Sequence, residues 1–313
     1  MEPDSDCLIF EVPALGVGVT YGETTFQFKA PCFNPNNNEE FVYIYENKIT
    51  GISSLEIYNL TTKEKKVLVE DNVWDKSQPT WGINNRIAFI MNNQVCWINS
   101  DGTDLLQLGN DYKSHAPEWI NHDSSLTFTN YWLEPPSPDN GAKEHMYQSI
   151  LSSDGTSMDS FTVSFENGNV GGLGLGSFNN NSRLFARIYN TDDNEEFRLG
   201  LIDIQNALSL QTIEIPNLGN QSITCVKWHP NFEDIYFSFY YSDFYKYNLP
   251  SSKLTVITEA CDSKWYDKFS FSQNGEKMLV EKVCNTFDGI SIWQSSKIVL
   301  INIDGTGEEI VLE

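Results

Sequence analysis

A unit of four short strands and tight turns, complete in residues 79–108, constrains the fold of this chain more than any other feature. Turn-forming residues separate segments rich in β-branched and aromatic residues, which is typical of short antiparallel strands. The expected strands end at Trp81 or span Arg86 to Ile90, Val95 to Ile98 and Leu105 to Leu108. Because four such strands cannot bury both of their faces alone, the unit needs copies of itself packed on each side.

Those copies recur along the chain, each marked by an aromatic residue at the end of its first strand. Pro117-Glu118-Trp119 repeats Pro79-Thr80-Trp81, and an Asp-Gly-Thr turn occurs at residues 101–103, 154–156 and 304–306. The successive spacings of the anchoring aromatics are 48, 38, 59, 50 and 43 residues, and the anchors are Phe33, Trp81, Trp119, Phe178, Trp228 and Phe271. A period that drifts around 40 to 50 residues, with four strands in each repeat, is typical of a β-propeller.

The predicted fold is therefore all-β, a six-bladed β-propeller of four-stranded antiparallel blades in one domain covering residues 1–313. Residues 1–30 form an N-terminal segment and the first inner strand. The expected blades span roughly residues 31–72, 73–111, 112–165, 166–219, 220–261 and 262–313. We expect residues 8–12 to lie beside the last blade and to help close the ring, because closure removes exposed sheet edges.

The residues that carry this pattern resemble the TolB-type propeller repeat, written P-x-W-S-P-D-G-x-x-I-A-F, then a strand, a D-G-T turn and a closing strand. The resemblance covers about residues 30–313, and it departs at His229-Pro230, where the family has Ser-Pro. It implies a non-enzymatic binding or scaffold protein of the periplasm or cell envelope, secreted with its leader removed. The motif carries no catalytic group, so this function comes by analogy only.

Composition narrows the choice of partners. The formal net charge is -23, which disfavours nucleic acid because phosphate binding needs Lys and Arg. No apolar stretch of about 18 residues is present, so no transmembrane segment is expected.

The six cysteines include no C-x-x-C pair, which disfavours zinc; a bridge between Cys261 and Cys284 is conceivable, but sequence does not set the connectivity. We expect a monomer without cofactors.

The predicted binding surface is the face that carries the inter-blade loops and the irregular insertions at residues 131–144, 191–196 and 284–293. Aromatic side chains in such loops can stack on a sugar or grip a peptide, and polar neighbours can fix its orientation. The expected partner is a protein or a carbohydrate, and the candidate residues are Trp74, Asp75, Tyr112, His115, Tyr131, Trp132, Trp265, Tyr266 and Asp267. The structural alternative is that the loop tryptophans fold back over a blade edge.

One enzymatic alternative stays open at this point. Some lyases acting on acidic oligosaccharides resemble this type of propeller and hold a metal through several histidines in the channel. This chain has four histidines, of which His115 and His145 are the secondary candidates for a metal site. A metal-dependent lyase or hydrolase is therefore the second hypothesis. Serine hydrolase chemistry has no support, because no G-x-S-x-G motif is present.

Overall fold

The computed structural model describes residues 20–73, 77–108, 113–120, 124–134, 143–152, 154, 156, 158–161, 176–179, 184–190, 197–203, 208–215, 223–240, 243–261, 263–288 and 291–313. Every regular element in this part of the chain is a β-strand. Accordingly, these residues contain no helix that is long and apolar enough to cross a membrane.

The strands form antiparallel sheets, which we number in chain order. Sheet 1 contains β2 (Phe26–Phe33), β3 (Glu40–Asn47), β4 (Ile52–Asn59) and β5 (Lys65–Glu70). Sheet 2 contains β6 (Thr80–Trp81), β7 (Arg86–Met91), β8 (Gln94–Asn99) and β9 (Leu106–Leu108). Sheet 3 contains β10 (Lys113–Ile120), β11 (Ser125–Glu134), β12 (Lys143–Ser152) and β13 (Met158–Phe161).

The second half of the chain continues the same order of strands. Sheet 4 contains β14 (Gly176–Phe178), β15 (Leu184–Asn190), β16 (Phe197–Asp203) and β17 (Leu208–Ile215). Sheet 5 contains β18 (Ile223–Trp228), β19 (Asp234–Phe239), β20 (Phe244–Asn248) and β21 (Lys253–Thr258). Sheet 6 contains β22 (Lys264–Phe271), β23 (Lys277–Phe287), β24 (Ser291–Asn302) and β25 (Glu309–Leu312), and β1 (Thr20–Glu23) joins it as a fifth strand.

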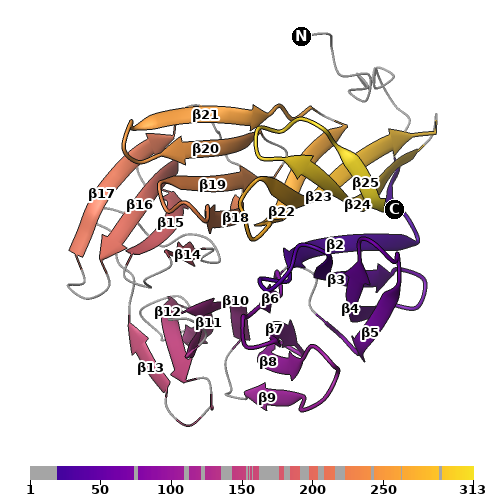
Figure 1. Cartoon of the computed structure of the whole chain (residues 1–313), viewed down its shortest axis with the longest axis horizontal. Coiled ribbons are helices and arrows are strands. Elements are labelled where there is room, and N and C mark those ends of the chain that lie inside the picture. Colours follow the sequence, from indigo (N-terminus) through magenta and orange to yellow (C-terminus); the bar gives the residue numbers. More distant parts are fainter. Residues whose placement is uncertain are drawn as a thin grey trace.

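The sheets are arranged as the blades of a β-propeller, with the first strand of each sheet facing the centre (Figure 1). The predicted anchors lie at the ends of these inner strands: Phe33, Trp81, Phe178, Trp228 and Phe271 are the last residues of their strands, and Trp119 is the last but one. The all-β class and the four-stranded antiparallel blades are thus confirmed. Sheet 6 departs from the four-stranded pattern because β1 is added to it.

Packing between adjacent sheets forms the core. Trp81 packs in one buried cluster with Val42 and Ile44 of sheet 1, and Trp119 packs in another with Ala88 and Ile90 of sheet 2. Equivalent clusters join sheets 4 and 5, 5 and 6, and 6 and 1. Sheets 1, 2, 5 and 6 therefore each bury both faces against their neighbours, as the repeat requires.

The two ends of the sheets form two different surfaces. At the turn face, turns join the first strand of a sheet to the second and the third to the fourth. At the hairpin face, hairpins join the second strand to the third and the chain passes from one sheet to the next. The Asp-Gly-Thr turns lie on the turn face, where Asp101 Oδ1 accepts hydrogen bonds from Thr103 N at 2.9 Å and Thr103 Oγ1 at 2.7 Å. Asp304 and Thr306 repeat this geometry.

Strand β1 contributes to ring closure. It pairs in parallel with the start of β24, from Thr20 opposite Ser291 to Glu23 opposite Gln294, and the chain then enters β2 of sheet 1. The first sheet is therefore tied to the last at the hairpin face. Residues 8–12, which we expected beside the last blade, lie outside the described residues.

Candidate functional site

Side chains fill the centre of the ring. Gln78, which precedes β6, donates from Nε2 to Pro31 O of sheet 1 at 2.6 Å and to Phe269 O of sheet 6 at 2.9 Å. Its Oε1 lies 3.6 Å from the Sγ of Cys225 in sheet 5. One amide from sheet 2 thus contacts three other sheets across the centre of the ring.

A charged pair lies beside this amide. Lys227 Nζ of β18 is 3.8 Å from Glu118 Oε1 of β10, and the two side chains are 23% and 16% exposed. Glu118 also accepts from Ser177 Oγ at 2.8 Å and from Phe178 N at 3.0 Å. Burial lowers the pKa of Lys227, but the nearby Glu118 carboxylate opposes this effect, and the net shift is upward. The ammonium therefore stays charged and holds sheet 5 to sheets 3 and 4.

The thiols near this pair are protonated. Burial raises the pKa of both Cys32 and Cys225, although the Lys227 ammonium opposes the shift. Thiolate is the nucleophilic form of cysteine, so neither group is activated for catalysis. The bridge considered between Cys261 and Cys284 is wrong, because Cys284 is a free thiol while Cys261 is disulfide-bonded.

A buried carboxyl group joins sheet 6 to sheet 1. Glu281 Oε2 accepts from Ala30 N at 2.9 Å, and Ala30 has a φ of 51° where β2 is irregular. Ser296 Oγ lies 2.7 Å from Phe28 O and 2.9 Å from Glu281 Oε1. A hydroxyl has a single hydrogen and the Phe28 carbonyl can only accept, so a protonated Glu281 satisfies all three groups. Burial and the nearby Asp267 raise the pKa of Glu281 to about 7.

The structure places the predicted binding residues unevenly. Trp74, Asp75 and Tyr112 lie outside the described residues, and their role stays a prediction. Tyr131 and Trp132 belong to β11 rather than to a loop, because β11 and β12 continue as a paired hairpin up to Glu134 opposite Lys143. The loop placement of these two residues is therefore wrong.

The expected loop at residues 265–267 is also wrong. Trp265, Tyr266 and Asp267 lie in β22, the inner strand of sheet 6, and Trp265 is completely buried. Its ring meets Tyr240 edge-on, with ring centroids 5.4 Å apart. The pairing of β22 with β23 shifts register between Tyr266 and Phe269. This shift interrupts the alternation of apolar and polar residues by which a strand is recognised in a sequence. Trp265 presents no surface to a partner in this structure.

The His115/His145 pair does not form a compact site. His115 of β10 is opposite Thr129 of β11, whereas His145 of β12 is opposite Trp132 of β11. With about 4.8 Å between strands and 3.3 Å per residue, their backbones are roughly 14 Å apart. This separation does not favour a shared ion, and the paired metal site stays a prediction. Within the described residues, no group of three or more metal-ligating side chains occurs.

Exposed apolar residues gather on the hairpin face around β1. Tyr21 is 79% exposed and Ile49 is 78% exposed, and Phe26, Ile52 and Trp293 also present large apolar area to solvent. We call these five residues the β1 patch. Pairing of Gly22 with Trp293, of Phe26 with Asn47 and of Asn47 with Ile52 brings their backbones together. The sequence placed Trp293 on this face through the insertion at residues 284–293, but not the other four members, which come from two separate segments.

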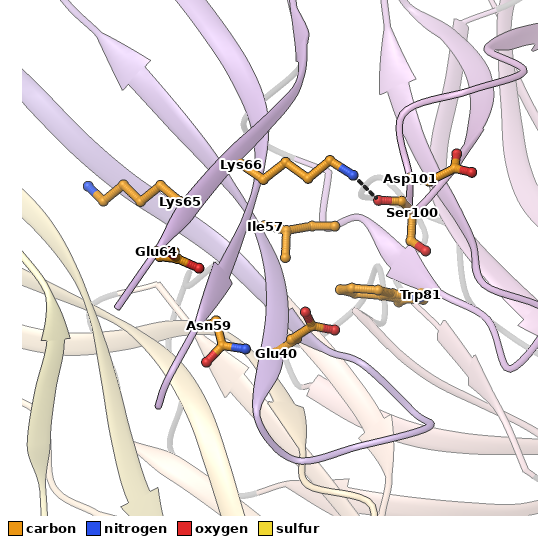
Figure 2. Close-up of a pocket in the computed structure, with 9 residues that line it drawn as sticks. All are labelled: Glu40, Ile57, Asn59, Glu64, Lys65, Lys66, Trp81, Ser100 and Asp101. Carbon is orange, nitrogen blue, oxygen red and sulfur yellow. Dashed lines mark hydrogen bonds between the residues drawn. The ribbon is translucent and has the colours of Figure 1, made fainter. Parts of the chain in front are cut away.

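A groove lies on the opposite, turn face between sheets 1 and 2 (Figure 2). Its volume is 610 Å³, and its lining includes Ile57, Trp81 and Glu40. Lys66 spans the groove and donates from Nζ to Ser100 O at 3.0 Å (Figure 2). A cavity of several hundred Å³ is the size of a small-molecule or side-chain site. The sequence analysis missed the groove because regular turns, rather than insertions, border it.

Comparison with solved structures supports the resemblance to TolB-type propellers. A protein of Agrobacterium tumefaciens assigned as TolB is 14% identical, with a TM-score of 0.59 over 83% of this chain and 88% of the other. TolB of Acinetobacter baumannii is 12% identical, with a TM-score of 0.53 over 83% of this chain and 65% of the other. At these identities the likeness establishes a shared fold.

A propeller enzyme is similar to the same degree. Oligogalacturonate lyase of Vibrio parahaemolyticus is 8% identical, with a TM-score of 0.53 over 90% of each chain. No protein-family model and no curated protein sequence matches the chain. The comparisons therefore support the TolB-like propeller fold, which unrelated functions share.

Proposed function

We propose that this protein is a non-enzymatic binding or scaffold protein that engages a protein partner through its hairpin face. The β1 patch carries this proposal. Large apolar residues clustered in the open mark interaction sites on many proteins, because such area is costly to leave in water. The aliphatic side chains of Ile49 and Ile52 favour a protein over a carbohydrate, since sugar hydroxyls need polar partners.

The contacts across the centre of the ring favour a face rather than a channel as the binding surface. Gln78 bonds to Pro31 and Phe269, so its side chain occupies part of the centre. Trp74, Asp75, Tyr112, Tyr131 and Trp132 remain proposed contributors to binding. The periplasmic or envelope location implied by the resemblance belongs to the same proposal.

The metal-dependent lyase has only a shared fold in its favour, and a fold alone carries no activity. We therefore retain the binding function as the conclusion. We further infer a ring of six blades, in which sheet 6 with its added strand β1 counts as the last blade. Its inner strand lies at the centre beside β2 and β18, as a sixth blade requires (Figure 1).

An affinity experiment tests the binding function. Immobilised wild-type protein is incubated with an envelope extract of the native host, alongside a Tyr21→Glu/Ile49→Glu double variant. Ile83→Glu is the matched control. Ile83 is an apolar residue that is half exposed, but it lies on the turn face. The proposal expects a protein retained by the wild type and by Ile83→Glu, and reduced at least tenfold by the double variant. Equal retention by all three proteins would remove the β1 patch from the binding surface.

A further inference from the structure

The groove between sheets 1 and 2 offers a second binding surface, separate from the proposed hairpin-face site. Ile57 and Trp81 supply its apolar floor and are 7% and 5% exposed. Glu40, Glu64 and Asp101 add three carboxylates to its rim. A groove with an apolar floor and a charged rim suits a ligand that is itself apolar along its length and charged at one end.

Both lysines of the rim already have partners within the protein. Lys66 Nζ donates to Ser100 O at 3.0 Å, and Lys65 Nζ lies 5.0 Å above the centre of the Phe28 ring. Figure 2 shows Lys65 directed away from the middle of the groove, while Lys66 crosses it. The positive charges are thus held in place by the fold.

The carboxylates retain free acceptor atoms. Glu40 Oε2 accepts from Asn34 Nδ2 at 3.1 Å and Asn37 Nδ2 at 3.3 Å, but nothing in the described chain donates to Oε1. Asp101 uses Oδ1 for both bonds to Thr103 and leaves Oδ2 without a donor from the described residues. The charged groups of the rim can therefore still accept hydrogen bonds, mainly through these carboxylate oxygens. Such acceptors suit a cationic ligand.

Two uncharged hydrogen-bond donors, the indole of Trp81 and the side-chain amide of Asn59, also line the groove. Within the described structure, Trp81 Nε1 has no hydrogen-bond acceptor, although Trp81 is almost fully buried. The corresponding anchor in sheet 5 has one, because Trp228 Nε1 donates to Ser177 O at 2.9 Å. Asn59 accepts through Oδ1 from Thr61 N and Thr62 N, which leaves its amide nitrogen as the other donor at the rim.

We propose that this groove binds a basic segment of a polypeptide, with one Lys or Arg side chain inserted between sheets 1 and 2. The alkyl part of that side chain packs on Ile57 and Trp81, and its cationic end meets Glu40 and Asp101. A backbone carbonyl of the segment accepts from the Asn59 amide at the rim. The net charge of -23 adds a long-range attraction for a basic segment and increases its rate of encounter.

Fluorescence anisotropy with a defined probe tests the proposal. The probe is a labelled, end-capped hexapeptide of alternating glycine and arginine, and its control carries neutral citrulline in place of arginine. The arginine peptide is expected to bind at least tenfold more tightly than the citrulline peptide, since charge-assisted hydrogen bonds are lost in the latter. Equal binding of the two peptides, or no binding of the arginine peptide, would overturn the proposal.

Matched variants locate the site. Glu40→Gln should weaken binding about tenfold, whereas Glu309→Gln removes the same charge from exposed β25 of sheet 6 and should weaken it less than twofold. Equal weakening would mean that the peptide senses net charge alone, which contradicts a groove site. Thermal unfolding confirms that each variant folds. The β1-patch double variant should bind this probe like the wild type, so failure of either surface is distinguishable from failure of the other.

Discussion

The turn face and the hairpin face differ in how far the sequence determines them. On the turn face, the Asp-Gly-Thr turns at Asp101 and Asp304 have the same two hydrogen bonds with nearly the same lengths. On the hairpin face, sheet 1 turns within residues 48–51, whereas β23 and β24 of sheet 6 extend for 11 and 12 residues. A repeated motif therefore fixes one face, and unrepeated insertions shape the other.

This difference affects where binding sites arise. The hairpin face gains the β1 patch because the added strand β1, the long hairpin of sheet 6 and the short turn of sheet 1 bring exposed apolar residues together. The turn face forms its groove between two regular blades, with Ile57 and Trp81 in its lining. Long insertions are thus a poor guide to the second kind of site.

The largest expected effect concerns Trp265 at the hairpin end of β22. Trp265→Ala removes a completely buried indole, and we expect a loss of about 3–5 kcal/mol in the free energy of unfolding. Denaturant titration measures the change. A loss below about 1 kcal/mol would indicate that Trp265 lies in an exposed loop, as predicted from the sequence.

Two glycines compare the faces directly. Gly305 on the turn face has a φ of 85°, and an added Cβ would lie 2.5 Å from Ile257 O. Gly51 on the hairpin face has a φ of 68°, with no atom within 4 Å of such a Cβ. We expect Gly305→Ala to cost about 2–4 kcal/mol and Gly51→Ala about 1 kcal/mol, because only the first adds a clash to backbone strain.

The outcome can be read from denaturation midpoints. Similar losses in the free energy of unfolding for the two substitutions would show that the neighbouring sheet moves away from a Cβ at position 305 with little penalty. The clash at Gly305 would then add nothing to the backbone strain that both substitutions share.

The next effect is a pH dependence at the contact between sheets 6 and 1. Glu281 has a pKa raised from 4.5 to about 7, so the folded state retains a proton that the unfolded state releases. Its contribution is full below about pH 4.5 and is lost as the pH rises through 7, with a change on the order of 3 kcal/mol. Glu281→Gln should flatten this part of the stability profile. An unchanged profile in the variant would show that Glu281 is ionised when folded.

The smallest effect concerns one Asx turn. Asp304→Ala removes two hydrogen bonds to Thr306 at an exposed turn, so we expect a small fall in melting temperature. Amide hydrogen exchange at Thr306 should accelerate clearly, because its N–H loses its acceptor. Unchanged exchange would mean that the backbone of the turn, including Gly305, holds this geometry without the carboxylate.

The comparison also shows what the sequence can predict. Anchors such as Trp81 and Trp228 end inner strands as expected, because aromatic burial between blades is a local, repeated requirement. Trp265 was misplaced because its strand is irregular between Tyr266 and Phe269. The contact of Gln78 with sheets 1, 5 and 6 depends on the curvature of the whole ring, which no local pattern encodes.

Gln78 also gives the disc a mechanical property. A hollow ring transmits a disturbance around its circumference from blade to blade, but a side chain that spans the centre connects opposite sheets directly. A tilt of sheet 2 is then transmitted to sheet 5 through the side-chain amide of Gln78. A partner that displaces sheet 2 would therefore also act on sheet 5, without first displacing the sheets between them.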